Sequence, residues 1–169
     1  MKRRDLFAVQ IYLLRHGIAE DGRPGQRDAD RPLTSEGAKK VRAILKLAHA
    51  AGASPSLILS SPYRRAVETA EICAKEFSNK NQILRTKALT PDSSPQAVWE
   101  EIRVHRSETQ ILLSGHEPLC SALTRHLLGA PSLMVDFKKG ALVRIDMDAI
   151  GAHPRGVLKW MITARLAGE

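Results

Sequence analysis

Short apolar runs alternate along the chain with longer segments whose apolar residues recur every three or four positions. Short bounded runs are typical of buried strands, and the periodic segments are typical of amphipathic helices. The runs predict four strands, over 9–14, 57–59, 82–86 and 110–113. The periodic segments predict helices over about 35–51, 62–77, 95–106 and 117–128.

This alternation predicts the fold class. Strand–helix–strand units with right-handed crossovers build a parallel sheet covered by helices on both faces. Two further strand-like runs, 141–147 and 157–166, are joined by a Gly- and Pro-rich turn and predict an antiparallel hairpin at one edge. We therefore expect a three-layer α/β fold with a mostly parallel central sheet. A length of 169 residues, without a linker or repeat, predicts one domain over residues 1–169.

The net charge of +8 raises the question of a nucleic-acid partner. The basic residues are spread along the chain, and the densest run, Lys2-Arg3-Arg4, is followed at once by Asp5. Aromatic residues make up only 4% of the chain, too few for a platform that stacks on single strands. We expect no nucleic-acid partner. A solvated basic surface and a site for an anionic substrate both remain open.

The cysteines and the apolar runs bear on the compartment. Two cysteines, Cys73 and Cys120, provide no disulfide framework, and both fall in helical patterns typical of buried free thiols. No apolar run approaches the roughly 20 residues that span a bilayer, and the start of the chain lacks the apolar stretch of a signal peptide. We therefore expect a cytoplasmic monomer without a membrane partner.

Chemically active side chains follow three of the predicted strands directly. Arg15 and His16 follow the first strand, Arg64 and Arg65 come shortly after the second, and His116 follows the fourth. Ligands of open α/β sheets bind beyond the carboxyl ends of the strands. We therefore expect both histidines and two of these three arginines to meet at one edge of the sheet.

These residue types suit phosphoryl transfer. Arginine presents a planar fork that matches phosphate oxygens, and histidine can act as a nucleophile or as an acid and base. Helices that begin near Pro62 and Pro118 would direct their positive ends at the same point. Gly17 and Gly115 allow the backbone to approach closely beside each histidine. The pattern predicts a phosphoryl-transfer site that needs no metal.

Three motifs carry a family resemblance. The segment Leu14-Arg15-His16-Gly17 resembles the RHG signature of the histidine phosphatase (phosphoglycerate mutase-like) superfamily. Residues 61–70 are similar to the SPxxRAxxTA segment of that family, and residues 115–118 resemble its second histidine motif. The three motifs occur in order, each at a strand end, and the resemblance covers about residues 9–128. It implies a phosphoglycerate mutase-like fold.

Within that superfamily the chain resembles the small SixA-type phosphohistidine phosphatases. Residues 30–37 are similar to their DxxRPLTxxG loop, with shorter spacing after Asp30, and residues 88–91 match their LTP element. The resemblance implies a phosphatase that removes phosphate from a phosphohistidine of a protein. It implies no metal and no cofactor.

The resemblance assigns a role to each strand-end residue. It implies that His16 attacks phosphorus and becomes phosphorylated, while Arg15 and Arg65 hold the phosphoryl oxygens and His116 stabilises charge in the transition state. Gly17 lies beside the bound group. Arg65 matches the family arginine because it directly precedes an alanine, so Arg64 is expected to be an exposed residue at the helix start.

The general acid is missing from its usual place. Larger family members protonate an alcohol leaving group with an acidic residue, and residues 89–95 lack the usual Glu-containing pattern. The carboxylates near the site in sequence are Glu20, Asp21, Asp92 and Glu117. A protonated phosphohistidine leaves as a neutral imidazole and needs no strong acid, whereas an alkoxide needs one. This favours a phosphohistidine substrate; a small-molecule phosphomonoesterase and a non-catalytic phosphate-binding module are the alternatives.

Overall fold

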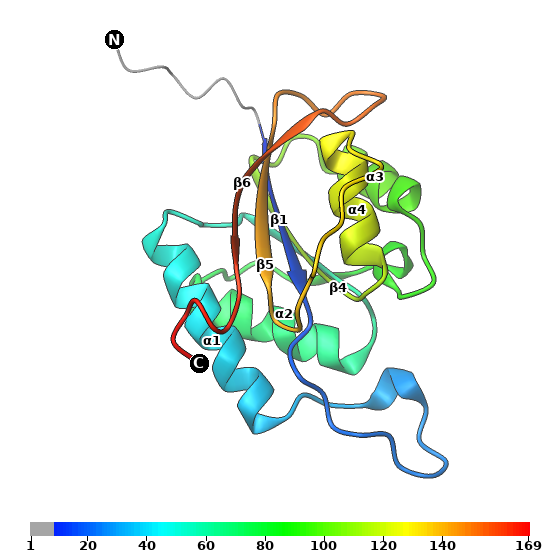
Figure 1. Cartoon of the computed structure of the whole chain (residues 1–169), viewed down its shortest axis with the longest axis vertical. Helices are drawn as coiled ribbons and strands as arrows, with labels where there is room; N and C mark the ends of the chain where they lie inside the picture. The colour runs from blue at the N-terminus through cyan, green and yellow to red at the C-terminus, as the bar shows by residue number, and fades with distance from the viewer. Residues whose placement is uncertain (1–8) are drawn as a thin grey trace.

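The computed structural model describes residues 9–169, which form a six-stranded sheet with helices on both faces (Figure 1). The strand order is β3-β2-β4-β1-β5-β6. The basic run at residues 2–4 lies outside the described residues. Within 9–169, no helix has both the length and the apolar character needed to cross a membrane.

The elements follow the predicted alternation. The strands are β1 (Val9–Arg15), β2 (Leu57–Ser60), β3 (Leu84–Arg85), β4 (Gln110–Gly115), β5 (Leu142–Met147) and β6 (Gly156–Ile162). The helices are α1 (Ser35–Ala50), α2 (Arg64–Glu76), α3 (Pro95–Val104) and α4 (Leu119–Leu128), with short 3₁₀ turns η1 (Asp28–Asp30) and η2 (Lys87–Leu89).

The sheet is mixed in the way that the sequence predicts. β1 pairs in parallel with β4, which pairs in parallel with β2, while β5 and β6 add an antiparallel hairpin beyond β1. The prediction of a mostly parallel sheet with an antiparallel edge is therefore confirmed. The largest differences in strand boundaries are at β3, which has two residues rather than five, and at β6, which ends at Ile162 rather than at residue 166.

Alternate residues of β1 face the two helical layers. Tyr12 and Leu14 pack in one buried cluster with residues of α1 and α2, whereas Ile11 and Leu13 pack in the other with residues of α3 and α4. Side chains of a strand point alternately to its two faces, so one central strand anchors both layers. The result is the expected three-layer arrangement, with α1 and α2 on one side of the sheet and α3 and α4 on the other (Figure 1).

The register of the sheet brings the strand ends together. Arg15 at the end of β1 pairs with Gly115 at the end of β4, and Ser60 at the end of β2 pairs with Ser114. The residues that follow these three strands therefore start from one edge, at the bottom of Figure 1. The antiparallel β5 begins at the same edge, because Leu142 pairs with Leu14.

Candidate active site

His16 lies just beyond β1 with its ring fixed by its own neighbour. The ring nitrogen Nδ1 is 2.7 Å from the backbone carbonyl oxygen of Gly17. A carbonyl only accepts, so Nδ1 carries the proton and the lone pair of the neutral ring is on Nε2. The amide of Gly17 donates to Oγ1 of Thr69 on α2, 3.2 Å away, which fixes the carbonyl and the ring together. The orientation of His16 thus presents Nε2 to the site.

Burial keeps this imidazole neutral. Burial lowers the pKa of His16 to about 4; the bond to Gly17 opposes that change, while the positive charges of Arg65, Arg15 and Lys139 add to it. An ordinary histidine titrates near pH 6.5, so at neutral pH His16 is deprotonated at Nε2. A neutral imidazole with its lone pair on Nε2 is the form that attacks phosphorus.

Arg65, near the start of α2, faces that lone pair. Its Nε donates toward Nε2 of His16 across 3.3 Å, and only 6% of the residue is exposed. Its two terminal nitrogens donate to Asp28, which lies on η1. The ring of Tyr63 lies 5.1 Å from the guanidinium carbon, within the range of a cation–π contact. Arg65 is therefore rigid before any ligand arrives.

Arg15 is anchored by the loop that precedes β5. Its Nη1 donates to the carbonyl oxygen of Phe137 at 2.7 Å, and the amide of Gly140 lies within 3.1 Å of the Arg15 and His16 carbonyl oxygens. Its Nε is buried without a hydrogen-bond partner. A buried guanidinium N–H without an acceptor is costly, because it has given up its hydration. This donor is suited to an anion held beside His16.

His116 is the second histidine of the site. Its ring centroid is 5.0 Å from that of His16, and its Nε2 lies 2.8 Å from the hydroxyl oxygen of Ser61. Burial, together with the nearby His16 and Arg65, lowers its pKa to about 3, so the ring is neutral. Its Nδ1 is buried without a partner. His116 therefore offers a second unpaired polar atom at the same point.

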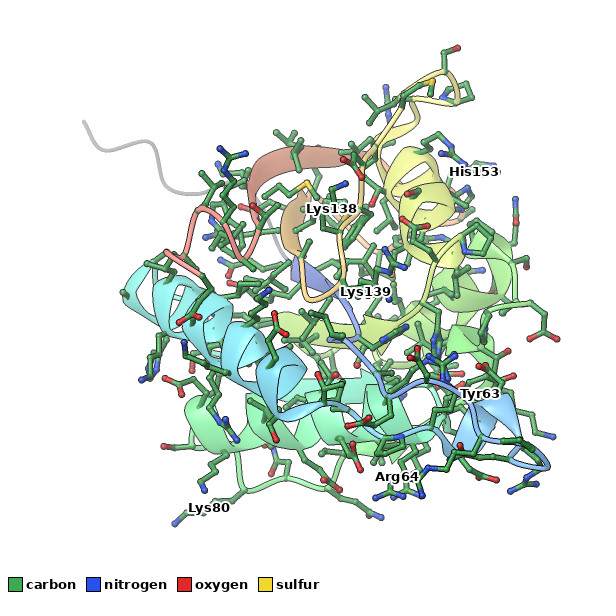
Figure 2. The ribbon with its side chains drawn as sticks, turned by 60° about the horizontal axis from the view of Figure 1, so that its bottom comes forward. Tyr63, Arg64, Lys80, Lys138, Lys139 and His153 are labelled. Atoms are coloured by element: carbon green, nitrogen blue, oxygen red, sulfur yellow. The ribbon has the colours of Figure 1, made fainter. Side chains whose placement is uncertain are left out.

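The structure brings together the four residues expected at the sheet edge and separates Arg64 from them. Arg64 is the first residue of α2, its side chain is 58% exposed, and it pairs with Glu68 one turn along. Figure 2 turns this edge toward the viewer and shows Tyr63 and Arg64 at the start of α2, with Lys138 and Lys139 on the loop before β5. The helix begins at Arg64 rather than at Pro62, because Tyr63 is still extended.

The carboxylates suggested as general acids are all elsewhere engaged or exposed. The Glu117 carboxylate accepts from the hydroxyl and amide of Ser121 and so caps α4. Asp92 is exposed, and its bonds to Thr90 and to its own backbone lower its pKa. Glu20 and Asp21 are exposed on the loop after His16. Within residues 9–169, none of the four is hydrogen-bonded to His16 or His116.

Asp28 is the site residue that sequence reasoning missed. It contacts Arg65, whereas Asp30, assigned to the loop motif, forms an exposed ion pair with Arg27. The signal was present: Asp28 stands three residues before Arg31, which is the spacing of the DxxR motif, and Asp30 stands only one before it. Burial acts to raise the pKa of Asp28, but hydrogen bonds from Arg65 and Arg31 outweigh it and lower the pKa. Asp28 is therefore ionised and is not a proton donor at neutral pH.

The site as a whole is suited to bind a tetrahedral anion such as phosphate. Nε2 of His16 accepts from the Nε–H of Arg65, the ring of His116 lies 5.0 Å from that of His16, and the positive charge of Arg15 acts on His16. Arg15 Nε and His116 Nδ1 are both buried without a partner. Preorganised donors of this kind stabilise charge that develops during phosphoryl transfer. Within residues 9–169, no three His, Cys, Asp or Glu side chains cluster in a way that could hold a metal ion.

Comparison with known proteins agrees with this geometry. The sequence profile of the histidine phosphatase superfamily (branch 1) matches residues 11–89. An uncharacterized protein of Picosynechococcus is 32% identical over 164 residues, which cover 91% of this chain and 99% of the relative.

Two solved structures share the fold over nearly the whole chain. The protein histidine phosphatase SixA, complexed with tungstate, is 23% identical with a TM-score of 0.83 and covers 93% of this chain and 98% of its own. A protein of Agrobacterium tumefaciens proposed to be a phosphohistidine phosphatase SixA is 25% identical with a TM-score of 0.77 and covers 93% and 99%.

Proposed function

The chain belongs to the histidine phosphatase superfamily, whose branch 1 profile matches residues 11–89, and from that premise we propose that it removes phosphate from phosphohistidine in a protein, through a phosphorylated His16. The family and the SixA-like neighbours support phosphatase activity. The finer assignment depends on one observation: Nδ1 of His16 is committed to Gly17, which leaves the lone pair of Nε2 as the nucleophile in a site where Arg15 Nε and His116 Nδ1 are buried without partners.

The first step transfers the phosphoryl group to the enzyme. The lone pair on Nε2 of His16 forms a bond to phosphorus while the P–N bond of the substrate breaks. The electron pair of that bond stays on the substrate imidazole, which leaves as a neutral ring when its other nitrogen already carries a proton. Arg15, Arg65 and His116 hold the equatorial oxygens, so most of the catalysis is positioning and electrostatics.

The second step regenerates His16. A water oxygen bonds to phosphorus, the bond to Nε2 breaks, and its electron pair returns to the ring as the lone pair of the resting state. Nδ1 keeps its proton on the Gly17 carbonyl throughout, and the water proton leaves with the phosphate product. Apart from the substrate and the attacking water, the enzyme's own residues supply every group in this scheme.

The engagement of the nearby carboxylates favours a phosphohistidine substrate over an alkyl phosphate. Glu117 caps a helix, and Asp28 is held ionised by two arginines. An alkoxide leaving group would need a proton from such a group, whereas a protonated phosphoimidazole does not. Of the two SixA structures, one is a protein histidine phosphatase and the other a proposed phosphohistidine phosphatase, which agrees with this preference.

The proposal is tested on a phosphohistidine transfer domain. The variant His16→Ala is expected to lose at least about 1,000-fold in kcat, because removal of a nucleophile eliminates the covalent route. It is also expected to yield no acid-labile phosphoenzyme. His153→Ala, an exposed histidine labelled in Figure 2, is the matched control and is expected to keep wild-type activity. Undiminished turnover by His16→Ala would contradict the nucleophile assignment.

A substrate panel separates the proposal from its alternatives. Free phosphohistidine and the phosphorylated domain are expected to turn over at least about 100-fold faster than alkyl phosphates, because no positioned acid assists the alkoxide. Faster turnover of alkyl phosphates would favour a small-molecule phosphomonoesterase, with Glu20, Asp92 or Glu117 to be tested as its acid. Binding of phosphopeptide without turnover would indicate a phosphate-binding module.

A further inference from the structure

Arg65 is aimed by a residue that belongs to none of the three motifs around the histidines. Its Nη1 donates to the carbonyl oxygen of Asp28 at 2.7 Å, and its Nη2 donates to the Oδ2 of Asp28 at 2.9 Å. The guanidinium is planar, so fixing both terminal nitrogens fixes the direction of Nε–H. That direction leads to Nε2 of His16, 3.3 Å away.

Asp28 is itself held from the other side. Its Oδ1 accepts from Nη1 of Arg31 at 2.8 Å, and Nε of Arg31 donates to the carbonyl oxygen of Glu20 at 2.7 Å. The carboxylate therefore uses one oxygen for Arg65 and the other for Arg31. The Asp28 side chain is 55% exposed, whereas the Arg65 side chain is 7% exposed and the Arg31 side chain is 25% exposed. Of the two bonds made by this carboxylate, the one to Arg65 is therefore better shielded from water.

We propose that Asp28 is a positioning residue that aims the Nε–H of Arg65 at the nitrogen where the phosphoryl group is gained and lost. The proposal rests on the proposed role of His16 as the nucleophile. Asp28 hydrogen-bonds to arginines and not to His16, so it acts through Arg65. Asp28 engages one N–H of each terminal nitrogen, Nη2 through its carboxylate and Nη1 through its backbone carbonyl, so the Nε–H is the donor of Arg65 that is directed at His16.

A kinetic test distinguishes a loss of Arg65 orientation from a loss of phosphate binding. In Asp28→Ala, Arg65 keeps the bond from Nη1 to the backbone carbonyl of residue 28 but loses its carboxylate partner. It can still attract phosphate, but its Nε–H is no longer fixed in one orientation toward the transition state. We expect kcat on free phosphohistidine to fall about 10- to 100-fold, since small misplacements cost this much, and KM to change less than about threefold. Asp28→Asn keeps an acceptor for Arg65 and is expected to recover part of kcat.

Arg31→Ala is the matched control. It removes the second partner of Asp28 and the bond to Glu20, but it leaves the Asp28–Arg65 pair intact. It is expected to lower kcat by less than about threefold. Equal losses in Arg31→Ala and Asp28→Ala would mean that the loop as a whole matters, which would overturn the proposal.

A double-mutant comparison tests whether the effect passes through Arg65. Interacting residues give non-additive effects, so Asp28→Ala is expected to cause no further loss in an Arg65→Ala background. A full additional 10-fold loss in that background would show that Asp28 acts by another route.

An NMR measurement provides a readout that needs no turnover. In the wild type, the Nε–H of Arg65 is buried and bonded to His16, so its proton signal is expected to be protected from exchange with water; its absence in Arg65→Lys assigns it. The signal is expected to vanish or shift in Asp28→Ala and to persist in Arg31→Ala. An unchanged signal in Asp28→Ala overturns the positioning role. If the signal behaves as expected but the wild type does not hydrolyse phosphohistidine, the proposed function fails and the positioning of Arg65 stands.

Discussion

The two buried neutral histidines, His16 and His116, make the stability of the protein depend on pH. Burial is the main reason that the pKa of His16 is lowered to about 4 and that of His116 to about 3, from an ordinary value near 6.5. Between those values the unfolded chain binds protons that the native protein does not. The free energy of unfolding therefore rises with pH in this window and falls on acidification.

This stability difference can be measured. We expect the free energy of unfolding to decrease from pH 6.5 toward pH 4, each histidine contributing at most about 1.4 kcal/mol per pH unit. Urea titrations at several pH values are the measurement. His116→Gln is expected to have a shallower pH dependence, and His153→Ala, which removes an exposed histidine, is the control. An identical slope in His116→Gln would contradict the assignment of a neutral buried ring.

At the scale of residues, motif spacing predicted which side chains meet at the strand ends and missed the groups that hold them in place. Arg65 was distinguished from Arg64 because it precedes an alanine, and the structure buries the first and exposes the second. The acceptor for Arg15 is the Phe137 backbone carbonyl, 122 positions away in the chain, and a carbonyl leaves no trace in a residue pattern. Side-chain identity thus indicated which groups gather at the site, but long-range pairing decides what holds them.

At the scale of elements, α1 and the loop after His16 are in unusually close contact. A Cβ added to Gly37, in the first turn of α1, would lie 2.3 Å from the backbone oxygen and 2.7 Å from the backbone nitrogen of Ile18. Backbone atoms cannot give way as a flexible side chain does. Gly37 therefore allows the helix to pack directly on the residue that follows Gly17, the carbonyl partner of His16.

Gly37→Ala is expected to damage both stability and activity. Overpacking costs about 1–3 kcal/mol, or roughly 3–10 °C in Tm for a chain of this size, and this outweighs the helix propensity gained. Displacement of Ile18 would also move the Gly17 carbonyl and release the His16 ring, so kcat is expected to fall. Thermal denaturation and phosphohistidine turnover are the measurements. Gly151→Ala, with no atom within 4 Å of the added carbon, is expected to change neither.

Periodicity predicted the elements well where burial is one-sided. α1 begins after Thr34, whose hydroxyl accepts from the amide of Gly37, and α4 ends at Gly129 with a positive φ of 61°. The strand expected over 82–86 shrinks to two residues because it lies at the edge of the sheet and pairs only with β2. Apolar content alone does not tell an edge strand from an extended loop.

At the scale of the whole molecule, the net charge of +8 favours a protein substrate with an acidic surface. Lys138, Lys139 and Arg64 lie on the face that carries the site (Figure 2), and the Lys139 charge reaches His16. Excess charge of one sign steers oppositely charged partners and is screened by salt, with a Debye length of about 10 Å at 0.1 M and about 3 Å at 1 M.

We expect salt to lower kcat/KM for a protein substrate more than for free phosphohistidine. For a phosphorylated histidine domain with an acidic surface, kcat/KM is expected to fall about tenfold or more between 0.05 and 0.5 M salt, because long-range attraction is lost. For free phosphohistidine the decrease is expected to be less than about threefold, since buried pairs are screened weakly. Steady-state rates across a salt series provide the measurement, and parallel decreases would argue against a steering role.

The antiparallel return of β5 has a consequence for where this chain can be shortened. Every recognised motif lies within about residues 9–128, so a fragment that ends there looks complete to any search by pattern. Yet the carbonyl that holds Arg15 and the amide that meets the His16 carbonyl both come from the loop at 137–140. Cutting after α4 would also leave β1 as a bare edge, open to pairing with another chain. We therefore expect that a working fragment must include the loop at 137–140 and the hairpin β5–β6, although the last sequence motif ends near residue 128.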